Sequence, residues 1–229
     1  MDFDSFVLSA ATGDIYDEPA ARAHADILEY RMDLAADPID KLDEYDGELP
    51  LLVTNRVEWE GGDAPDTAAR LDALETAVEY NAVEAVDVEL GALVGEGKYN
   101  ADRVVEAARG LDTAVIVSAH DFQQTPKREK IEEWLTRACK HGDVGKVATT
   151  AAGPADVLAL LNATHEKTRR GRTVATMAMG EAGRHSRAVA PLYGSKIGYA
   201  PVRPENATAP GQYDLETLRE LIDQLKSRQ

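Results

Sequence analysis

Thr113-Ala-Val-Ile-Val-Ser-Ala-His-Asp-Phe122 and Asp143-Val-Gly-Lys-Val-Ala-Thr-Thr150 are two apolar runs, and each carries one reactive side chain. Short runs of this kind are typical of parallel strands that are buried on both faces. His120 lies near the end of the first run, and Lys146 interrupts the second. We therefore expect two successive buried strands that hold an imidazole and an amine at matching places.

Similar short apolar runs alternate with longer amphipathic segments from one end of the chain to the other. This alternation predicts repeated units of one strand and one helix. The predicted strands cover residues 6–11, 27–34, 49–56, 85–90, 113–122, 144–150, 173–179 and 196–202. The main predicted helices cover residues 66–80, 101–110, 127–140, 154–166 and 214–227.

The number of predicted strands distinguishes between two α/β architectures. Eight parallel strands with following helices can close into a (β/α)₈ TIM barrel. An open doubly wound sheet of this length usually has fewer strands and a glycine-rich first turn. The first turn here, Ser9-Ala-Ala-Thr-Gly-Asp14, lacks that pattern. The sequence therefore predicts an α/β fold with a single (β/α)₈ barrel over residues 1–229.

The chain is strongly acidic, with 41 Asp and Glu against 25 Lys and Arg and a formal net charge of −16. The excess is spread along the chain and repels nucleic acid and anionic membranes, so neither is an expected partner. Two explanations remain open: a strongly solvated surface, or the adaptation found in cytoplasmic proteins of salt-accumulating organisms. The N-terminal segment lacks a basic region followed by an apolar one, which predicts a cytoplasmic protein.

Cysteine and histidine positions give no sign of a disulfide or a metal site. Cys139 is the single cysteine and falls in a helical pattern, so we expect a structural thiol. No Cys pair and no helix-spaced His pair is present, so zinc binding is not expected. The other histidines fall on predicted helices or their ends and are expected to be surface or capping residues: His24, His141, His165 and His185.

Three charged residues alternate along the second predicted strand: Glu29, Arg31 and Asp33. Alternate residues of a strand share one face, so these side chains are expected to point into the barrel or its mouth. Buried charges are costly unless they pair with each other or with a ligand. The pattern therefore predicts either a binding site or a structural Glu–Arg–Asp ion network.

Further charges lie on the third and fourth predicted strands. Arg56 ends the third strand, and its planar fork of donors suits a carboxylate, so Arg31 and Arg56 together suggest an anionic substrate. Asp87 and Glu89 alternate on the fourth strand. They are expected to orient Lys146 or the arginines, or equally to offset nearby positive charge.

Lys146 admits a catalytic and a structural interpretation. Burial disfavours the ammonium form, and an unprotonated amine can attack a carbonyl to form a Schiff base. Histidine can act as a base and then as an acid, as an elimination requires. Alternatively, the stem of Lys146 packs in the barrel while its amine pairs with Asp87 or Glu89.

The ordered motifs of the chain resemble those of the type I 3-dehydroquinate dehydratase family, the Schiff-base enzymes of the shikimate pathway in aromatic amino acid biosynthesis. The resemblance covers nearly the whole chain. Its motifs are Glu29-Tyr-Arg-Met-Asp33, Thr54-Asn-Arg56, Asp87-Val-Glu-Leu90, Ser118-Ala-His-Asp-Phe122, Gly145-Lys-Val-Ala148, Met179-Gly-Glu-Ala-Gly-Arg-His-Ser-Arg187 and Ala209-Pro-Gly-Gln212.

The resemblance implies a homodimeric (β/α)₈ barrel without metal or organic cofactor. It also implies a carbon–oxygen lyase that converts 3-dehydroquinate to 3-dehydroshikimate and water. Lys146 is then expected to form the imine, His120 to act as general base and acid, and Glu60 to lie near His120. Family substrate contacts fall on Ser9, Glu29, Arg31, Arg56, Arg187, Thr208 and Gln212.

The chain differs from longer family members in three respects. It begins at the first barrel strand, whereas many relatives carry an extra N-terminal hairpin over the barrel floor. Ala119 stands where a tyrosine is frequent, which is expected to loosen the packing around His120. Thr208 stands where serine is common, and its hydroxyl can serve the same purpose.

Two other functions fit part of the pattern. A Schiff-base aldolase acting on a sugar phosphate is expected to have a glycine-rich phosphate site after the last two strands. Arg187 and Gln212 in those loops suit a carboxylate and hydroxyls better. A catalytically silent barrel that binds a small anion is expected to have lost His120 or Lys146, and both are present. The segment 200–211 is predicted to close over the substrate.

Overall fold

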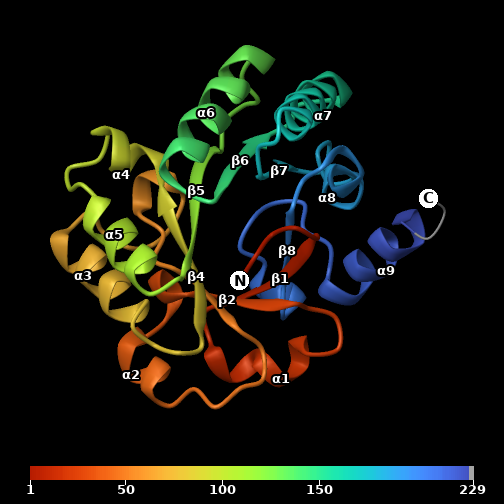
Figure 1. The fold of residues 1–229 in the computed structure, drawn as a ribbon. Coiled ribbons are helices and arrows are strands. Elements are labelled where there is room, and N and C mark those ends of the chain that lie inside the picture. The colour runs from red at the N-terminus through yellow and green to blue at the C-terminus, as the bar shows by residue number, and fades with distance from the viewer. Residues whose placement is uncertain (227–229) are drawn as a thin grey trace.

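Eight parallel strands surround a central core, and helices cover the outer side of the strands (Figure 1). The computed structural model describes residues 1–226. The predicted domain over residues 1–229 and the last predicted helix, 214–227, both extend beyond them. The strands are β1 (Val7–Thr12), β2 (Ile27–Arg31), β3 (Leu51–Thr54), β4 (Val83–Glu89), β5 (Ala114–Asp121), β6 (Val144–Thr150), β7 (Val174–Met179) and β8 (Ile197–Pro201).

The strands form one sheet in the order β7-β6-β5-β4-β3-β2-β1-β8, and every ladder in it is parallel. The sheet curls until β7 meets the segment just before β8, through a parallel bridge between Val174 and Ser195. The hydroxyl of Ser195 also accepts a hydrogen bond from the Thr176 amide of β7 at 3.0 Å. The predicted barrel is therefore confirmed, with one lightly bonded seam.

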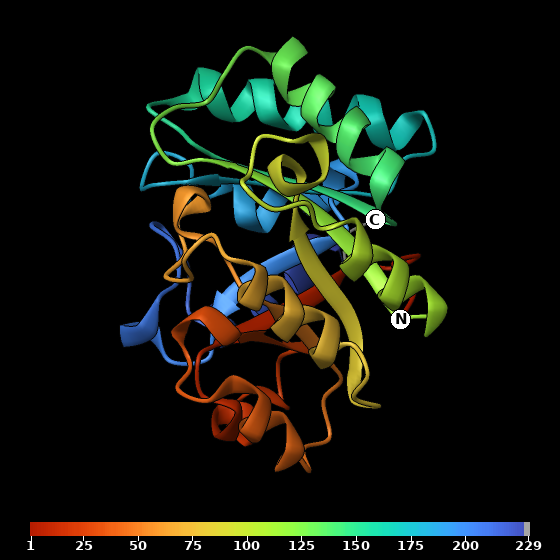
Figure 2. The same ribbon diagram turned by 90° about the vertical axis from the view of Figure 1, so that its left-hand side faces the viewer.

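Helices follow the strands around the ring, and the side view shows them outside the barrel (Figure 2). Several begin where the sequence offers a start signal, such as proline in the first turn of α2 and α7, or the Thr67 side chain that caps α3. The α-helices are α1 (Glu18–Ala21), α2 (Pro38–Asp43), α3 (Ala68–Ala77), α4 (Leu90–Val94), α5 (Asp102–Gly110), α6 (Arg128–His141), α7 (Pro154–Arg169), α8 (Ser186–Val189) and α9 (Leu215–Lys226). Short 3₁₀ helices lie at η1 (Ile15–Asp17), η2 (Met32–Leu34), η3 (Glu58–Glu60), η4 (Ala190–Tyr193) and η5 (Pro204–Asn206).

Apolar side chains form two layers. The larger layer lies between the strands and the helices, and the smaller one fills the barrel interior. Phe3 belongs to the inner layer, and Met1 packs against it. The amino group of Met1 lies 3.4 Å from Glu84 at the start of β4, and the N label lies in the middle of the ring (Figure 1). Side chains ahead of β1 therefore cover the barrel floor.

Two predicted strands are shorter than the apolar pattern indicated. The strand predicted over 27–34 ends at Arg31, because Met32–Leu34 turns into a 3₁₀ helix. The strand predicted over 49–56 is confined to Leu51–Thr54. Asn55 leaves the sheet and exchanges hydrogen bonds with Arg70 of α3. Both predicted strands thus end earlier than their apolar runs, and the residues just beyond the second strand make polar contacts instead.

No helix within residues 1–226 is long and apolar enough to cross a membrane.

Candidate active site

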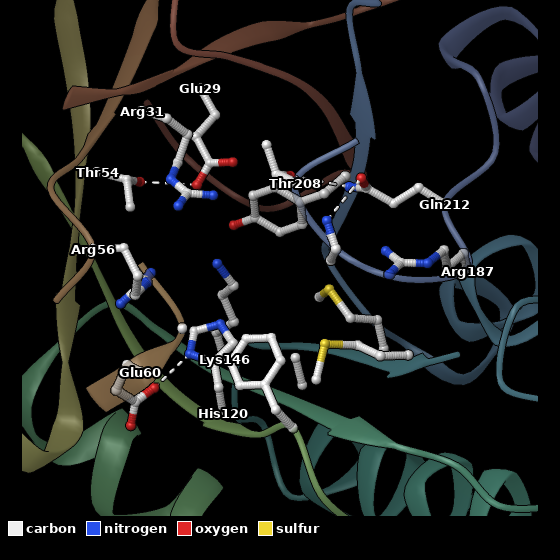
Figure 3. A pocket seen from close by; sticks show the side chains of 17 residues that line it. Glu29, Arg31, Thr54, Arg56, Glu60, His120, Lys146, Arg187, Thr208 and Gln212 are labelled. Atoms are coloured by element: carbon white, nitrogen blue, oxygen red, sulfur yellow. Dashed lines mark hydrogen bonds and ion pairs between the residues drawn. The ribbon is translucent and has the colours of Figure 1, made fainter. Parts of the chain in front are cut away.

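One pocket at the carboxyl ends of the strands contains most of the predicted site residues (Figure 3). This is the end at which (β/α)₈ barrels carry their active sites. Of the eleven predicted residues, Ser9 and Asp87 are not on its wall. The nine predicted residues that line it are Glu29, Arg31, Arg56, Glu60, His120, Lys146, Arg187, Thr208 and Gln212.

The register of two neighbouring strands places the imidazole and the amine on the same side of the barrel wall. Ser118 of β5 pairs with Lys146 of β6, and His120 lies two residues beyond Ser118. Residues two apart on a strand point to the same face, so both reactive side chains point inward. The two side chains therefore share the pocket.

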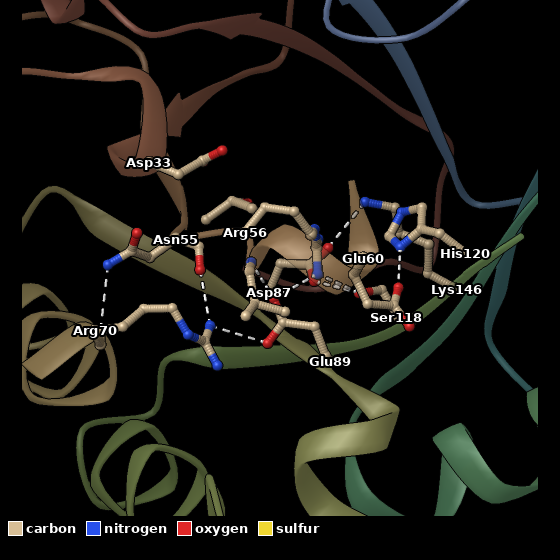
Figure 4. A network of polar contacts seen from close by, with 12 residues as sticks. Asp33, Asn55, Arg56, Glu60, Arg70, Asp87, Glu89, Ser118, His120 and Lys146 are labelled. Carbon is tan, nitrogen blue, oxygen red and sulfur yellow. Dashed lines mark hydrogen bonds and ion pairs between the residues drawn. The ribbon is translucent and has the colours of Figure 1, made fainter. Parts of the chain in front are cut away.

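His120 contacts a carboxyl group from the loop after β3. Its Nδ1 lies 2.5 Å from Oε2 of Glu60, which ends η3 (Figure 4). The Phe122 ring stacks on the imidazole with 5.9 Å between ring centres. Gly61 allows this stacking, because its φ is +78° and a Cβ there would lie 2.3 Å from the Phe122 ring. The predicted position of Glu60 beside His120 is thus present, and Nε2 of His120 is left for a ligand.

The Glu60–His120 pair has unusual proton affinities. Burial raises the pKa of Glu60 to about 8, against the opposing charge of Arg56. Burial, together with the positive charges of Arg56 and Lys146, holds the pKa of His120 well below its ordinary value. The proton that leaves near pH 8 belongs to the pair. After its loss, a neutral His120 can donate from Nδ1 to the carboxylate and accept a proton at Nε2.

Lys146 forms an ion pair at the base of the pocket. Its Nζ lies 2.9 Å from Oδ2 of Asp87 on β4. Oδ1 of Asp87 accepts hydrogen bonds from Arg56 at 2.7 Å and from the Ser118 hydroxyl at 2.6 Å. Burial opposes ionisation of Asp87, but the charges of Arg56 and Lys146 and these hydrogen bonds hold its pKa below its usual range. Asp87 therefore orients the amine from beneath, without lining the pocket.

Glu89, two residues further along β4, holds two arginines. It accepts hydrogen bonds from Arg56 at 3.0 Å and from Arg70 of α3 at 3.0 Å. Arg70 is buried and also donates to the Asn55 carbonyl at 2.8 Å. Two roles were open for Asp87 and Glu89: to orient the cations or to offset their charge. Their contacts do both. Arg70 was not predicted, because an arginine within a helix is normally exposed.

The charged residues on and just after β2 make two separate contacts. Arg31 pairs with Asp33 through two hydrogen bonds of 2.8 and 2.6 Å. Glu29 accepts a hydrogen bond from the Thr54 hydroxyl at 2.9 Å and faces the pocket. Asp33 lies in η2, beyond the end of the strand. Arg31 and Asp33 thus form the ion pair of the structural interpretation, while Glu29 and Arg31 remain on the pocket wall.

Arg187 differs from the other buried arginines of the site. It begins the first turn of α8 together with Ser186, and it is buried. Its guanidinium donates to the Pro210 carbonyl at 3.3 Å, and within residues 1–226 it has no carboxylate partner and its Nε no hydrogen-bond partner. Burial without a counter-charge lowers its pKa to about 10. Such a cation can bind an anionic ligand.

The loop after β8 closes one side of the pocket. Gln212 donates to the Thr208 hydroxyl at 3.4 Å and accepts from the Ala209 amide at 3.2 Å. Gly211 has a φ of +74°, and a Cβ there would lie 2.4 Å from the Gly180 carbonyl oxygen. A hollow of about 560 Å³ lies outside the pocket and shares Arg31, Gly61 and Thr208 with it. The predicted closure of segment 200–211 stays a prediction.

Ala119 lies beside a further cavity. This cavity of about 180 Å³ is lined by Glu60 and His120, and Trp59 and Trp134 also line it. The small Ala119 side chain therefore leaves space behind the imidazole, as its small size predicts.

Ser9 is fully buried on β1 and is not on the pocket wall. Its register partner on β8 is Tyr199, which does line the pocket and has Lys146 Nζ 4.2 Å from its ring centre. Tyr199 was not predicted, although alternation along β8 places it inward. Met177 and Met179 add an apolar wall from β7. Within the described residues, no cluster of three or more His, Cys, Asp or Glu side chains could hold a metal ion.

Comparison with known proteins agrees with this site. The family model described as Type I 3-dehydroquinase matches residues 11–229. A 3-dehydroquinate dehydratase of Haloarcula marismortui is 64% identical over 227 residues, which cover 99% of each chain. That of Halobacterium salinarum is 51% identical over 99% of this chain and 100% of the relative.

Solved structures give the same result. The crystal structure of 3-dehydroquinate dehydratase from Geobacillus kaustophilus has a TM-score of 0.85 and 28% identity, with 98% of this chain and 92% of that chain covered. The type I enzyme from Clostridium difficile, with covalently modified comenic acid, has a TM-score of 0.87 and 27% identity, with coverage of 98% and 94%. From its sequence and its fold alike, this chain belongs to the type I 3-dehydroquinase family.

Proposed function

We propose that this chain is a 3-dehydroquinate dehydratase that removes water from its substrate through a Schiff base on Lys146. The product is 3-dehydroshikimate, an intermediate of aromatic amino acid biosynthesis. Membership of the family makes the chain a hydro-lyase. The observation that carries the mechanism is one pocket that holds the Lys146 amine, the His120 imidazole and Arg187, which has no carboxylate partner among the described residues.

The reaction begins with attack of the Lys146 amine on the substrate ketone, which releases one water and forms the imine. The protonated imine is an electron sink, so the negative charge left by proton removal at the neighbouring carbon is stored as a neutral enamine. His120 takes that proton at Nε2. It then gives the proton to the departing hydroxyl, which leaves as water, and hydrolysis of the imine frees the product.

The other pocket residues bind and orient the substrate. Arg187 with Thr208 and Gln212 lies on one side of the pocket, and Glu29 with Arg31 lies on the other (Figure 3). A guanidinium without a carboxylate partner suits the substrate carboxylate, whereas Glu29 can accept hydrogen bonds from substrate hydroxyls. Arg56 contributes positive charge near the amine. Ser9 is also proposed as a substrate contact, although it lies behind the pocket wall.

Borohydride trapping tests the covalent step. The protein is incubated with 3-dehydroquinate, reduced with borohydride and weighed by mass spectrometry. We expect the mass to increase by one reduced adduct per chain and the increase to vanish in Lys146→Ala. If Lys146→Ala still turns over substrate without trapping an adduct, the Schiff-base mechanism is wrong.

His120→Ala is the matched variant for the proton-transfer step. It is expected to form the trapped adduct but to lose kcat by at least about 100-fold, the usual size of general acid–base catalysis. Unchanged turnover would remove the role assigned to His120. A silent anion-binding barrel would give neither turnover nor adduct in the unaltered protein.

We also propose that the protein is a cytoplasmic homodimer that needs no metal or organic cofactor. Light scattering at two protein concentrations is expected to give twice the mass of one chain. Turnover is expected to survive dialysis against a chelator.

A further inference from the structure

Tyr199 has a buried hydroxyl without a partner. The residue lies at the centre of β8, its side chain lines the pocket, and the residue is 5% exposed. Its Oη makes no hydrogen bond to any of residues 1–226. Burial of a hydroxyl without a hydrogen bond is unfavourable, because its contacts with water are lost and nothing replaces them.

Three other tyrosine hydroxyls that lie against the fold have partners. Tyr30 donates to the Pro38 carbonyl at 3.4 Å, Tyr45 to the Leu49 carbonyl at 2.5 Å, and Tyr80 to Asp43 at 2.8 Å. Tyr199 is more deeply buried than Tyr45 and Tyr80, so it has the greater need of a partner. An apolar ring alone would fill the same space without this cost, which points to a use for the oxygen.

The surroundings of Tyr199 indicate what that use is. The Tyr199 ring lies against the amine of Lys146, with Nζ 4.2 Å from the ring centre. Burial raises the pKa of Tyr199 well above its ordinary value, and the negative charges of Glu29 and Asp87 raise it further. The hydroxyl therefore stays protonated and can only donate or accept a hydrogen bond. It is not a source of protons for the reaction.

The residues that share the pocket with Tyr199 also locate its contact on the substrate. Glu29 lines the same pocket as Tyr199, and it lies across that pocket from Arg187, Thr208 and Gln212 (Figure 3). If the substrate carboxylate lies with Arg187, its ring hydroxyls lie on the Glu29 side. A ring hydroxyl beside the imine carbon is then the group within reach of a phenol that packs on Lys146.

We propose that Tyr199 is a substrate-binding residue whose hydroxyl forms a hydrogen bond with a ring hydroxyl of the substrate bound to Lys146. This inference rests on the proposed function. The hydroxyl is left unpaired when the pocket is free and is satisfied when the substrate is present, so part of the cost of its burial is recovered as binding.

Tyr199→Phe tests the proposal, because it removes one oxygen atom and keeps the ring beside Lys146. We expect kcat/KM for 3-dehydroquinate to fall roughly five- to tenfold, the value of one neutral hydrogen bond, with most of the change in KM. The melting temperature is expected to stay the same or rise, because an unpaired buried group has been removed. Borohydride trapping is expected to persist.

Tyr45→Phe is the matched control, because its hydroxyl has a backbone partner and lies outside the pocket. It is expected to lower the melting temperature and leave kcat/KM unchanged. The proposal is overturned if Tyr199→Phe leaves KM unchanged, or if it lowers the melting temperature as Tyr45→Phe does. Both outcomes leave the proposed function intact as long as the unaltered protein forms the trapped adduct, so the two failures are distinguishable.

Discussion

The arginines of the pocket differ in how many carboxylates each one contacts. Arg56 contacts both Asp87 and Glu89, and Arg31 contacts Asp33. Arg187 contacts none within residues 1–226. A buried guanidinium with carboxylate partners holds the fold together, whereas one without them has its binding capacity free for a ligand. The number of partners thus distinguishes Arg187, which meets no carboxylate within residues 1–226, from Arg31 and Arg56, which line the pocket and also support the fold.

Arg187→Met is expected to weaken substrate binding without harming the fold. A hydrogen bond to a charged group contributes about 1.5–3 kcal/mol, so KM is expected to rise roughly 10- to 150-fold. The melting temperature is expected to stay the same or rise, because a buried charge without a counter-charge is removed. Steady-state kinetics and thermal unfolding measure the two effects.

Arg70→Met is the control for that change, since Arg70 is an equally buried arginine that contacts Glu89. It is expected to lower stability. A normal KM in Arg187→Met would contradict the anion-binding role of Arg187.

The Glu60–His120 pair predicts the pH dependence of proton removal. The pair loses a proton near pH 8, because burial raises the pKa of Glu60 to about 8, and only then is Nε2 of His120 free to accept. We expect kcat/KM to rise with pH and to level off above about 8. In Glu60→Gln this acidic limb is expected to vanish, since the amide does not titrate. An unchanged limb in that variant would assign the proton to another group.

At the scale of elements, β4 is the central support of the site. Its last residues, Asp87 and Glu89, connect it to Arg56 after β3, Ser118 of β5, Lys146 of β6 and Arg70 of α3. The cost of burying each charge is offset only while its partners are in place. The barrel therefore fixes the amine through a network that spans four neighbouring strands.

Asp87→Asn is expected to destabilise the fold by about 3–5 kcal/mol, because Arg56 and Lys146 lose a buried counter-charge. Urea unfolding at pH 7 measures the change. The folded state holds the pKa of Asp87 below its ordinary value of 3.8. This carboxylate therefore stabilises the fold above that pH, and its contribution is lost as the pH falls below it.

Asp72→Asn is the control, since Asp72 forms an exposed ion pair with Arg103. Exposed pairs contribute about 0–1 kcal/mol. Equal losses in the two variants would show that the Asp87 network does not support the fold.

The sequence predicted the strands better than their ends. The apolar runs located all eight strands, because burial on both faces requires apolar side chains throughout. The strand predicted over 27–34 ends at Arg31, because Arg31 and Asp33 pair across a 3₁₀ turn instead of continuing the strand. The run 49–56 ended early through contacts of Asn55 with α3. Contacts with distant segments determine where these strands end, and the local pattern of apolar residues does not reveal those contacts.

At the scale of the whole molecule, the net charge of −16 acts on stability. Self-repulsion of a strongly charged chain destabilises the compact state, and salt shortens the range of that repulsion from about 10 Å at 0.1 M to about 3 Å at 1 M. The melting temperature is expected to rise by a few degrees between these NaCl concentrations. Calorimetry at both concentrations measures it, and a lower melting temperature in 1 M NaCl would contradict the expectation.

Much of the site could also be predicted. His120, Lys146 and the inward charges Glu29 and Arg31 of β2 follow from alternation on strands, and the family resemblance supplied Arg187, Thr208 and Gln212. Arg70 could not be predicted, because only the packing of α3 against β4 buries it. Tyr199 was missed although it shares the inward face of β8 with Ile197, because an inward tyrosine in a strand normally belongs to the core.

The Asp87 network has an electrostatic consequence for the proposed reaction. Three cations, Arg56, Arg70 and Lys146, share two carboxylates, Asp87 and Glu89, which leaves a surplus of one positive charge in this network. An iminium on Lys146 preserves that surplus, and the neutral enamine removes it. Proton transfer from the substrate to His120 would therefore leave this network electroneutral and move the positive charge to the imidazole at the most difficult moment of the dehydration.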